Sequence, residues 1–524
     1  MAVINAVQKT KGVADPLAAY DSMKSLWTRN RAVCSGERFV KDIDALIDTI
    51  TFTNLLIPFS PSMTQQQYDF YKAEAEFPGI TSQFAKMLVG GLLRKQPVLK
   101  LPDDAPAEAY QWIMDAFGQD NSPLVSFLDK ALWEEVQTAR AWIFLDYPKI
   151  SQAQADMMTK DDYANLKPYP ILVVGESVIN WKVSTDDSGV QQLSQLIIRG
   201  FEEDHNKNEF HAELIATVWV HELREGFYQI RKYQKRDSET QVAVINGAIQ
   251  KNFNAIAENF QLVETITNLE MNGERMTVIP AWPLNGSIDI VEPMLSPIID
   301  REVSLYNKIS RRNHLLYGAA TFTPVISSNM SDEAFEDIVS SGLGSWLKLQ
   351  QGDTAEVLAT PTDALQDMDR AIASSIEEIA KLGIRMLSPE SAQSGVALEI
   401  RNAAQTAQLG TFNLKASNQM ADLIAFMLNW RYDLQYKSTD IEFSLSNDFA
   451  TMSMDYNWLR LVTEWYQASL IPRNIWLQIL KENDIISPDY DDETGQQEIN
   501  DDELIQKVNT TDTKSYAKKL AEQQ

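Results

Sequence analysis

The sequence predicts an α+β protein that is mainly helical and holds an antiparallel β layer. Two long stretches, residues 296–319 and 361–386, repeat apolar side chains every three or four positions, which is the period of an amphipathic helix. Residues 169–280 instead alternate apolar and polar side chains, which is typical of strands with one buried face. An antiparallel layer inserted in a helical chain belongs to the α+β class.

The composition is that of a globular protein with a strong excess of acidic residues. The 524 residues are 44% hydrophobic and 23% charged, and the formal net charge is −27. The chain can therefore bury a large core, but it lacks the basic face with which proteins neutralise nucleic-acid phosphates. Solubility alone explains the negative charge, which is also compatible with a passage through which DNA slides without adhering.

Nothing in the sequence indicates an oxidising compartment or a membrane. Cys34 is the single cysteine, so an internal disulfide is impossible. Residues 1–20 lack the apolar segment of a signal peptide. A run of about 18 apolar residues, the length of a membrane-spanning helix, does not occur.

The N-terminal third is predicted to be helical, with one buried strand at residues 142–145 and an edge strand at 98–101. Gly90-Gly91 lies inside a strong helical pattern, and we interpret this pair as a site where another backbone packs closely. Apolar periodicity places the helices at residues 16–56, 66–75, 80–93, 106–117 and 123–139.

The β layer follows, with turns at Asp186–Gly189 and Asn272-Gly273. A Pro or a polar cluster ends each apolar run, and the runs are short enough to be strands. The candidate strands are residues 171–174, 178–183, 193–198, 214–220, 227–233 and 276–280.

The two long helices bracket a small mixed segment, in which strands are predicted at 323–326 and 346–349 and a helix at 332–340. Thr360 is a suitable N-cap and Pro361 suits the first position of the second long helix. A break at Ser388–Ser391 precedes a third, very long helical pattern. The chain ends with a strand at 441–445, a helical tail that includes 475–480, and an acidic run at 489–503.

Motifs for catalysis and cofactor binding do not occur in the sequence. It has no phosphate-binding G-x-x-x-x-G-K-[ST] loop, no G-x-G-x-x-G after a strand and no G-x-S-x-G elbow. His211 and His221 could both lie near the sheet, but no cysteine or paired spacing completes a zinc site. Cys34 lies in a polar helix end and reads as a buried or inert thiol. We therefore expect no catalytic residue, no cofactor and no metal.

The order of the elements resembles that of the portal proteins of tailed bacteriophages, the head-to-tail connector family. Three stretches of the N-terminal half carry the likeness: Trp27–Gly36, residues 73–97 ending in Arg94-Lys95-Gln96-Pro97, and Ser177–Trp181. The most specific likeness is the order long helix, small insert, long helix, loop with Ser394-Gly395, very long helix. Residues 461–480 resemble the tail helices of the family. The motifs are loose but extend over most of the chain.

The resemblance implies a portal-like division of the chain. It assigns the wing, with the helical N-terminal part and the β layer, to residues 1–295. The stem helices would be 296–320 and 361–387, and they would bracket a clip at 321–360. A tunnel loop at 388–395 would precede a long helix and return strand at 396–445, and residues 446–524 would form a crown-like helical region, short for the family.

By the same resemblance, copies of the chain form a ring, usually of twelve, at one vertex of the capsid in the virion, assembled in the host cytoplasm. The ring passes double-stranded DNA without sequence specificity during packaging, retention and ejection. The implied partners are the terminase large subunit, which hydrolyses ATP, a head-tail adaptor, and the major capsid and scaffolding proteins. The channel itself needs no catalysis, so the expected protein is not an enzyme.

Cations on the two stem helices are candidates for basic rings that face DNA. They are equally well explained as solvated helix faces with charge pairs four residues apart. The channel candidates are Arg301, Lys308, Arg311, Arg312, Lys381 and Arg385, and the tunnel-loop candidates are Ser388, Pro389, Glu390, Ser391 and Gln393.

Two other readings remain open at the level of sequence. The first is a virion adaptor or acidic structural scaffold without a channel. The second is a hydrolase that uses carboxylates of the β layer, which a pocket with converging and strongly perturbed acids would favour.

Overall fold

The computed structural model divides into two units, residues 1–450 and 451–524. Side chains at helix ends next to undescribed segments are not described, among them those of 383–387 and 395–408. The structure describes residues 12–41, 55–148, 157–159, 166–185, 189–204, 213–235, 260–320, 323–327, 331, 336, 354–358, 363–387, 395–446, 463–464, 466–467 and 472–482.

The first unit is α+β, as the periodicity predicts. Its N-terminal helices fall close to the expected stretches, and Thr64 and Gln67 form a reciprocal capping box at the start of α4. These helices are α1 (Ala18–Ser35), α2 (Glu37–Lys41), α4 (Gln65–Glu74), α5 (Ile80–Leu92), α6 (Ala107–Asp115) and α7 (Leu124–Thr138).

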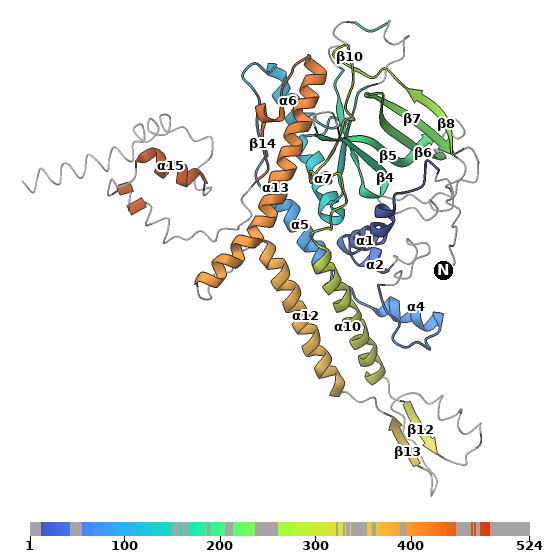
Figure 1. Cartoon of the computed structure of the whole chain (residues 1–524). Helices are drawn as coiled ribbons and strands as arrows, with labels where there is room; N and C mark the ends of the chain where they lie inside the picture. The colour runs from blue at the N-terminus through green and yellow to red at the C-terminus, as the bar shows by residue number, and fades with distance from the viewer. Residues whose placement is uncertain are drawn as a thin grey trace, which may run out of the picture. The chain divides into compact units, whose positions relative to one another are not determined.

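A five-stranded antiparallel sheet, in the order β4-β5-β6-β7-β8, forms the β layer (Figure 1). Its strands are β4 (Val178–Thr185), β5 (Gln191–Asp204), β6 (Glu213–Arg224), β7 (Phe227–Lys235) and β8 (Phe260–Ile266). A smaller sheet, β11-β2-β3, places the buried strand β2 (Trp142–Asp146) between β11 (Ala281–Pro283) and β3 (Tyr169–Val173). Residues 276–280, expected to be a strand, precede β11 instead.

Two further pairs of short strands and two 3₁₀ turns belong to the first unit. β9 (Glu270–Met271) and β10 (Glu274–Arg275) form a hairpin around the expected Asn272-Gly273 turn, where both φ angles are positive. β1 (Val98–Lys100) pairs with β14 (Glu442–Ser444), so residues more than 300 positions apart form one two-stranded sheet. Two short 3₁₀ turns, Gly175–Ser177 and Ser438–Asp440, precede β4 and β14.

Two long helices, α10 (Ser296–Ala320) and α12 (Asp363–Leu387), lie side by side and antiparallel (Figure 1). The third long helix, α13 (Gly395–Tyr432), contacts α12 and packs on β14. The described part of α12 spans Asp363–Leu387 and includes Gly383, whereas Pro361, the expected first residue, lies outside the described residues. In the second unit, α15 spans Arg473–Glu482.

Between α10 and α12, the described strands are β12 (Thr323–Ser327) and β13 (Thr354–Leu358), which pair antiparallel. The strand expected at 346–349 and most of the helix expected at 332–340 lie outside the described residues. The described partner of β12 is therefore 354–358, a segment for which the sequence analysis predicted no strand. The β-branched and apolar residues of Thr354–Leu358 suit a strand.

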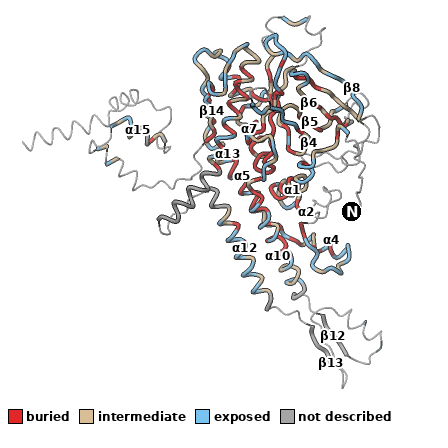
Figure 2. Tube along the Cα trace, in the orientation of Figure 1, coloured by how far each residue is buried: buried red, intermediate tan, exposed pale blue. Residues whose placement is uncertain are grey.

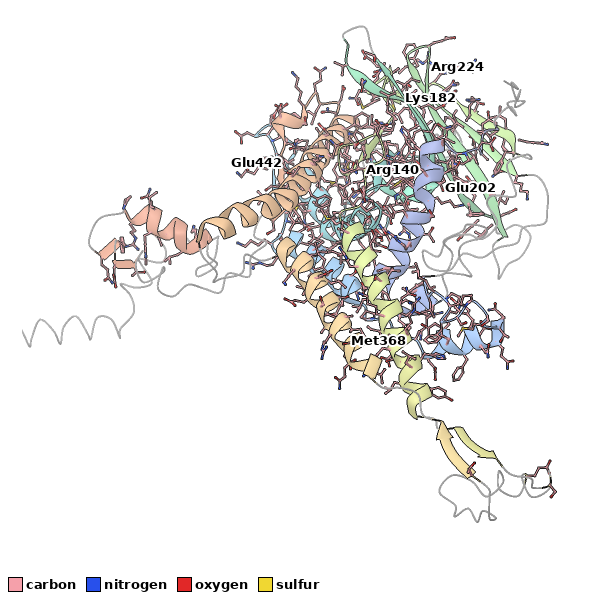
Figure 3. The ribbon with its side chains drawn as sticks, turned by 60° about the horizontal axis from the view of Figure 1, so that its bottom comes forward. Arg140, Lys182, Glu202, Arg224, Met368 and Glu442 are labelled. Atoms are coloured by element: carbon pink, nitrogen blue, oxygen red, sulfur yellow. The ribbon has the colours of Figure 1, made fainter. Side chains whose placement is uncertain are left out.

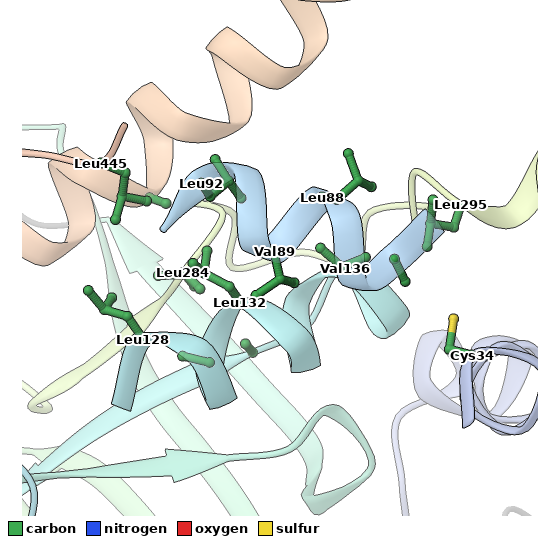
Figure 4. Close-up of a cluster of buried hydrophobic side chains, with 14 of the residues drawn as sticks. Cys34, Leu88, Val89, Leu92, Leu128, Leu132, Val136, Leu284, Leu295 and Leu445 are labelled. Carbon is green, nitrogen blue, oxygen red and sulfur yellow. The ribbon is translucent and has the colours of Figure 1, made fainter. Parts of the chain in front are cut away.

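The main core joins segments from most of the first unit (Figures 2 and 4). It packs α5 against α7 through Leu88, Val89 and Leu132, and it also contains Leu284 and Leu445. A second cluster lies between α1, β2 and the five-stranded sheet. The main core takes in α10 as far as Ile309 and α12 from Ile372 onward, so the far half of the pair extends beyond it.

Among the described residues, no backbone packs closely on Gly90-Gly91. A methyl group built at either glycine meets no atom within 4 Å, and Gly90 is exposed. The described part of the chain therefore does not contain the close backbone packing that we expected at this pair.

Candidate assembly and channel surface

Buried polar contacts fix the first half of α10 to α5 and to the loop before α4. Glu302 is fully buried, and its carboxylate accepts the backbone N–H groups of Ile80 at 2.6 Å and Thr81 at 2.8 Å. These N–H groups are in the first turn of α5 and therefore have no acceptor within the helix. The carboxylate supplies one and also interacts favourably with the helix dipole. Burial nevertheless raises the pKa of Glu302, and the hydrogen bonds from Thr81 and Ile80 oppose that rise.

Asn307, one turn further along α10, fixes the loop before α4. Its amide nitrogen donates to the carbonyls of Leu55 at 2.7 Å and Val303 at 2.8 Å, and its oxygen accepts the N–H of Ile57 at 2.7 Å. All the polar atoms of this side chain are thus engaged. The loop 55–57 is positioned by α10 and not only by its own sequence.

The helix α12 is held on one side, where its apolar stripe meets α10. Ser375 and Ile379 are buried, and the half-buried residues of the stripe are Leu365, Met368 (Figure 3), Ile372 and Leu382. Lys308 donates to the Ser375 hydroxyl at 2.6 Å. The other flank is exposed, including the large apolar side chain of Ile376, of which 44% is accessible.

Ion pairs join the two helices at their exposed margins. Arg312 lies 3.0 Å from Asp369, and Arg301 lies 3.4 Å from Glu378. Because both pairs are largely exposed, each contributes about 1 kcal/mol or less to the stability of the folded chain. They set the register of the two helices more than they stabilise them.

The structure brings most of the predicted channel cations onto the helix pair but engages them in different ways. Arg301, Arg312 and Lys308 contact α12, and Lys381 pairs with Glu377 in its own helix at 2.5 Å. Arg311 is exposed on the side of α10 that faces α4. The side chain of Arg385 and the tunnel-loop residues 388–394 lie outside the described residues.

A cluster of aromatic side chains that the sequence analysis missed lies where α4 meets α10. Phe59 contacts His314 at 4.6 Å between ring centroids, and His314 contacts Tyr71 at 5.2 Å. Phe70 contacts Tyr317 at 5.9 Å. We call the exposed part of this cluster, formed by Ile57, Phe59, Phe70 and Tyr317, the aromatic patch.

The buried ionisable groups have structural partners. Arg31 forms bidentate contacts with Glu134 and Glu176 at 2.6–3.0 Å, which link α1, α7 and the turn before β4. Burial raises the pKa of Glu135 to about 7, although it accepts the Ala141 N–H at 2.8 Å. Because these contacts join secondary-structure elements, they account for the burial of the charges without invoking catalysis.

The residues singled out for metal or thiol chemistry are also accounted for. His221 is buried and hydrogen-bonded to the Tyr228 hydroxyl at 2.8 Å, whereas His211 lies outside the described residues. Burial raises the pKa of Cys34 to about 12, which makes the thiol unreactive, as expected. Within the described part of the chain, no three His, Cys, Asp or Glu side chains gather as a metal site.

A pocket of about 450 Å³ lies between α13 and the β11 region. Its walls are aromatic and apolar, including Trp142, Trp282 and Phe426, and Asp422 is the acidic residue of its lining. Glu135, whose pKa is strongly raised, does not line it. The pocket therefore does not present the converging acids that a carboxylate hydrolase needs. Among the described helices, none has the length and apolarity to cross a membrane.

Comparison with known proteins gives one family match and several distant structural likenesses. Residues 295–431 match the model of a domain of unknown function, DUF4055. The match begins beside α10 and ends near the end of α13, so it treats the helix pair, the segment between and the long helix as one block. No curated protein matches the chain.

Two of the similar solved structures come from gene transfer agent particles. A chain of the virion of a native gene transfer agent particle is 9% identical, with a TM-score of 0.35, over 75% of this chain and 85% of that chain. A chain from the neck of an empty gene transfer agent particle with C6 symmetry is 8% identical, with a TM-score of 0.35, over 74% and 85%. A likeness at this level carries no argument about function.

Proposed function

We propose that the chain is a portal-type protein, whose copies form a ring with a central channel for double-stranded DNA at one vertex of a viral capsid. The observation that carries the proposal is the α10–α12 pair. It extends beyond the main core, it brackets a small insert, and α12 leaves the large apolar side chain of Ile376 uncovered among charged and small residues. A head-to-tail ring requires such uncovered faces, because each copy must bind its neighbour through two different surfaces.

In this proposal α10 and α12 are the stem, the insert at 321–360 is the clip, and the body is the wing. Residues 388–394 form the tunnel loop ahead of α13, which begins at Gly395, and residues 446–524 form the crown-like region. Cations on the stem that already pair with carboxylates offer DNA a nearly neutral wall. Such a wall lets the duplex slide instead of binding it, which agrees with the acidic balance of the chain.

The proposed protein is a conduit and an assembly platform, not an enzyme. ATP hydrolysis belongs to a separate terminase, and the head-tail adaptor, capsid and scaffolding proteins attach to the ring. The virion is the proposed location, and twelve is the proposed number of copies.

Native mass spectrometry with negative-stain imaging of the purified chain tests the proposal. We expect a species whose mass is an integer multiple of 59.3 kDa and images of a ring with a central hole. A single 59.3 kDa species at high protein concentration would overturn it. An oligomer without a hole would favour the adaptor reading instead.

A further inference from the structure

The aromatic patch is an unusual surface for a chain that stays alone. The exposed fractions are 53% for Ile57, 37% for Phe59, 50% for Phe70 and 49% for Tyr317. Scattered apolar side chains on a surface need no explanation, but Phe70 contacts Tyr317, Phe59 contacts His314 of the same helix α10, and Ile57 lies in the loop that Asn307 of α10 holds. Exposed apolar side chains gathered along one side of α10 favour a contact with another molecule.

Hydrogen bonds fix the backbone of the loop that carries Ile57 and the start of α4, which carries Phe70. Asn307 fixes both sides of Leu56 in the loop, and the Tyr68 hydroxyl donates to the Leu56 carbonyl at 2.8 Å. The capping box at Thr64 fixes the start of α4. A preorganised surface loses little conformational entropy on binding, so it binds more tightly than a mobile one.

The exposed side of α12 carries one large apolar side chain between two small ones. Ile376 projects from it, with Ala373 exposed three positions before and Ala380 half-buried four positions after. We call these three residues the α12 stripe. Small residues on both sides of one large apolar side chain let bulky rings pack close to the helix.

The two surfaces lie on opposite sides of α10, since α12 covers one side and α4 the other (Figure 1). The stripe of one copy therefore cannot reach the patch of the same copy. It can reach the patch of a neighbour in a head-to-tail arrangement, which is the geometry that closes into a ring.

Charge favours the same arrangement. The sequence of α10 holds four Arg and Lys against two Asp and Glu, whereas α12 holds three against five, so their formal charges are +2 and −2. Within one copy this difference appears as the pairs Arg312–Asp369 and Arg301–Glu378. Arg311, exposed beside Tyr71, offers positive charge at the patch to the acidic α12 of a neighbour.

We infer that the aromatic patch is the docking site for the α12 stripe of a second copy of this chain. The inference rests on the proposed ring and names the two faces that join its subunits. It also explains why Ile376 and Phe70 are exposed, since each would be buried in the contact between two copies.

Disulfide trapping tests the inference directly. The double variant Phe70→Cys with Ile376→Cys, oxidised with copper phenanthroline, should give a ladder of covalent multimers on a non-reducing gel. Cys34 is buried with a high pKa and will not interfere. The matched control pairs Phe70→Cys with Val263→Cys, a side chain 56% exposed on β8, and should give no ladder.

Native mass spectrometry of the same samples separates the two proposals. A ring without a ladder overturns the docking site and leaves the portal proposal standing, whereas a monomeric wild-type chain overturns the portal proposal itself. The cysteine substitutions could themselves prevent ring assembly, so a pair of substitutions at Ile376 tests the same contact without cysteines. Ile376→Glu should weaken assembly at least about tenfold, and Ile376→Leu should not; equal assembly of both would also overturn the docking site.

Discussion

The helices α10 and α12 form one pair but are held in very different ways. Buried hydrogen bonds from Glu302 and Asn307 anchor α10 to α5 and to the loop before α4. By contrast, α12 buries one stripe against α10 and leaves the opposite flank to solvent (Figure 2). The comparison teaches that α10 belongs to the fold of the single chain, while α12 is folded on one side and free to serve an interface on the other.

Among the substitutions that test this difference between α10 and α12, replacement of Glu302 should destabilise the folded chain most. Glu302→Ala leaves the N–H groups of Ile80 and Thr81 buried without an acceptor, so we expect the free energy of unfolding to fall by about 2–5 kcal/mol. Chemical denaturation measures it. Ser304→Ala, an exposed change on the same helix, is the control and should stay within about 0.5 kcal/mol. Equal losses for both variants would mean that Glu302 is no anchor.

The two flanks of α12 can be compared with one chemical change at two sites. Ile379 is 1% exposed in the core, so Ile379→Ala should cost about 2–5 kcal/mol of unfolding free energy. Ile376→Ala should cost about 0.5 kcal/mol or less when denaturation is followed on dilute, unassembled chain. A similar loss at both positions would show that the outer flank is packed within the single chain, and the one-sided description of α12 would be wrong.

Local periodicity predicted α10 and α12 but not the buried hydrogen bonds that hold α10 in place. The stripe of Ile299, Val303 and Tyr306 is a property of adjacent turns, so the sequence locates α10 well. Glu302 lies on the same face, and a carboxylate on an apolar stripe is the clue that we missed. Its partner Ile80 is 222 residues away, and no local pattern reports such a contact.

The same limit explains the other differences. β1 pairs with β14 across the chain, and the patch combines Phe59, Phe70 and Tyr317 from three segments. Each segment has an ordinary pattern by itself, so only the tertiary structure brings them together. The cations were visible in the sequence, but their carboxylate partners on α12 were not assigned. Whether they face a channel stays a prediction, because that depends on copies around an axis.

The anchor of α10 should also depend on pH, which gives the smallest and most specific effect. Burial raises the pKa of Glu302 above its ordinary value of 4.5, so the folded chain holds this proton more tightly than the unfolded chain. Its contribution to stability is therefore complete below pH 4.5 and declines as the pH rises through the raised pKa. Glu302→Gln cannot ionise, so its Tm relative to the wild-type chain should improve as the pH rises from 4.5 through the raised pKa and then level off.

Thermal melts across this pH range, with Glu378→Gln as the control, measure the effect. Glu378 is an exposed carboxylate whose pair with Arg301 contributes little, so its replacement should shift the Tm slightly. If the Glu302→Gln curve instead runs parallel to the wild-type curve, Glu302 keeps the same charge in both states. The buried anchor of α10 would then be held by hydrogen bonds strong enough to cancel the cost of burial, and α10 would differ from α12 in contacts alone.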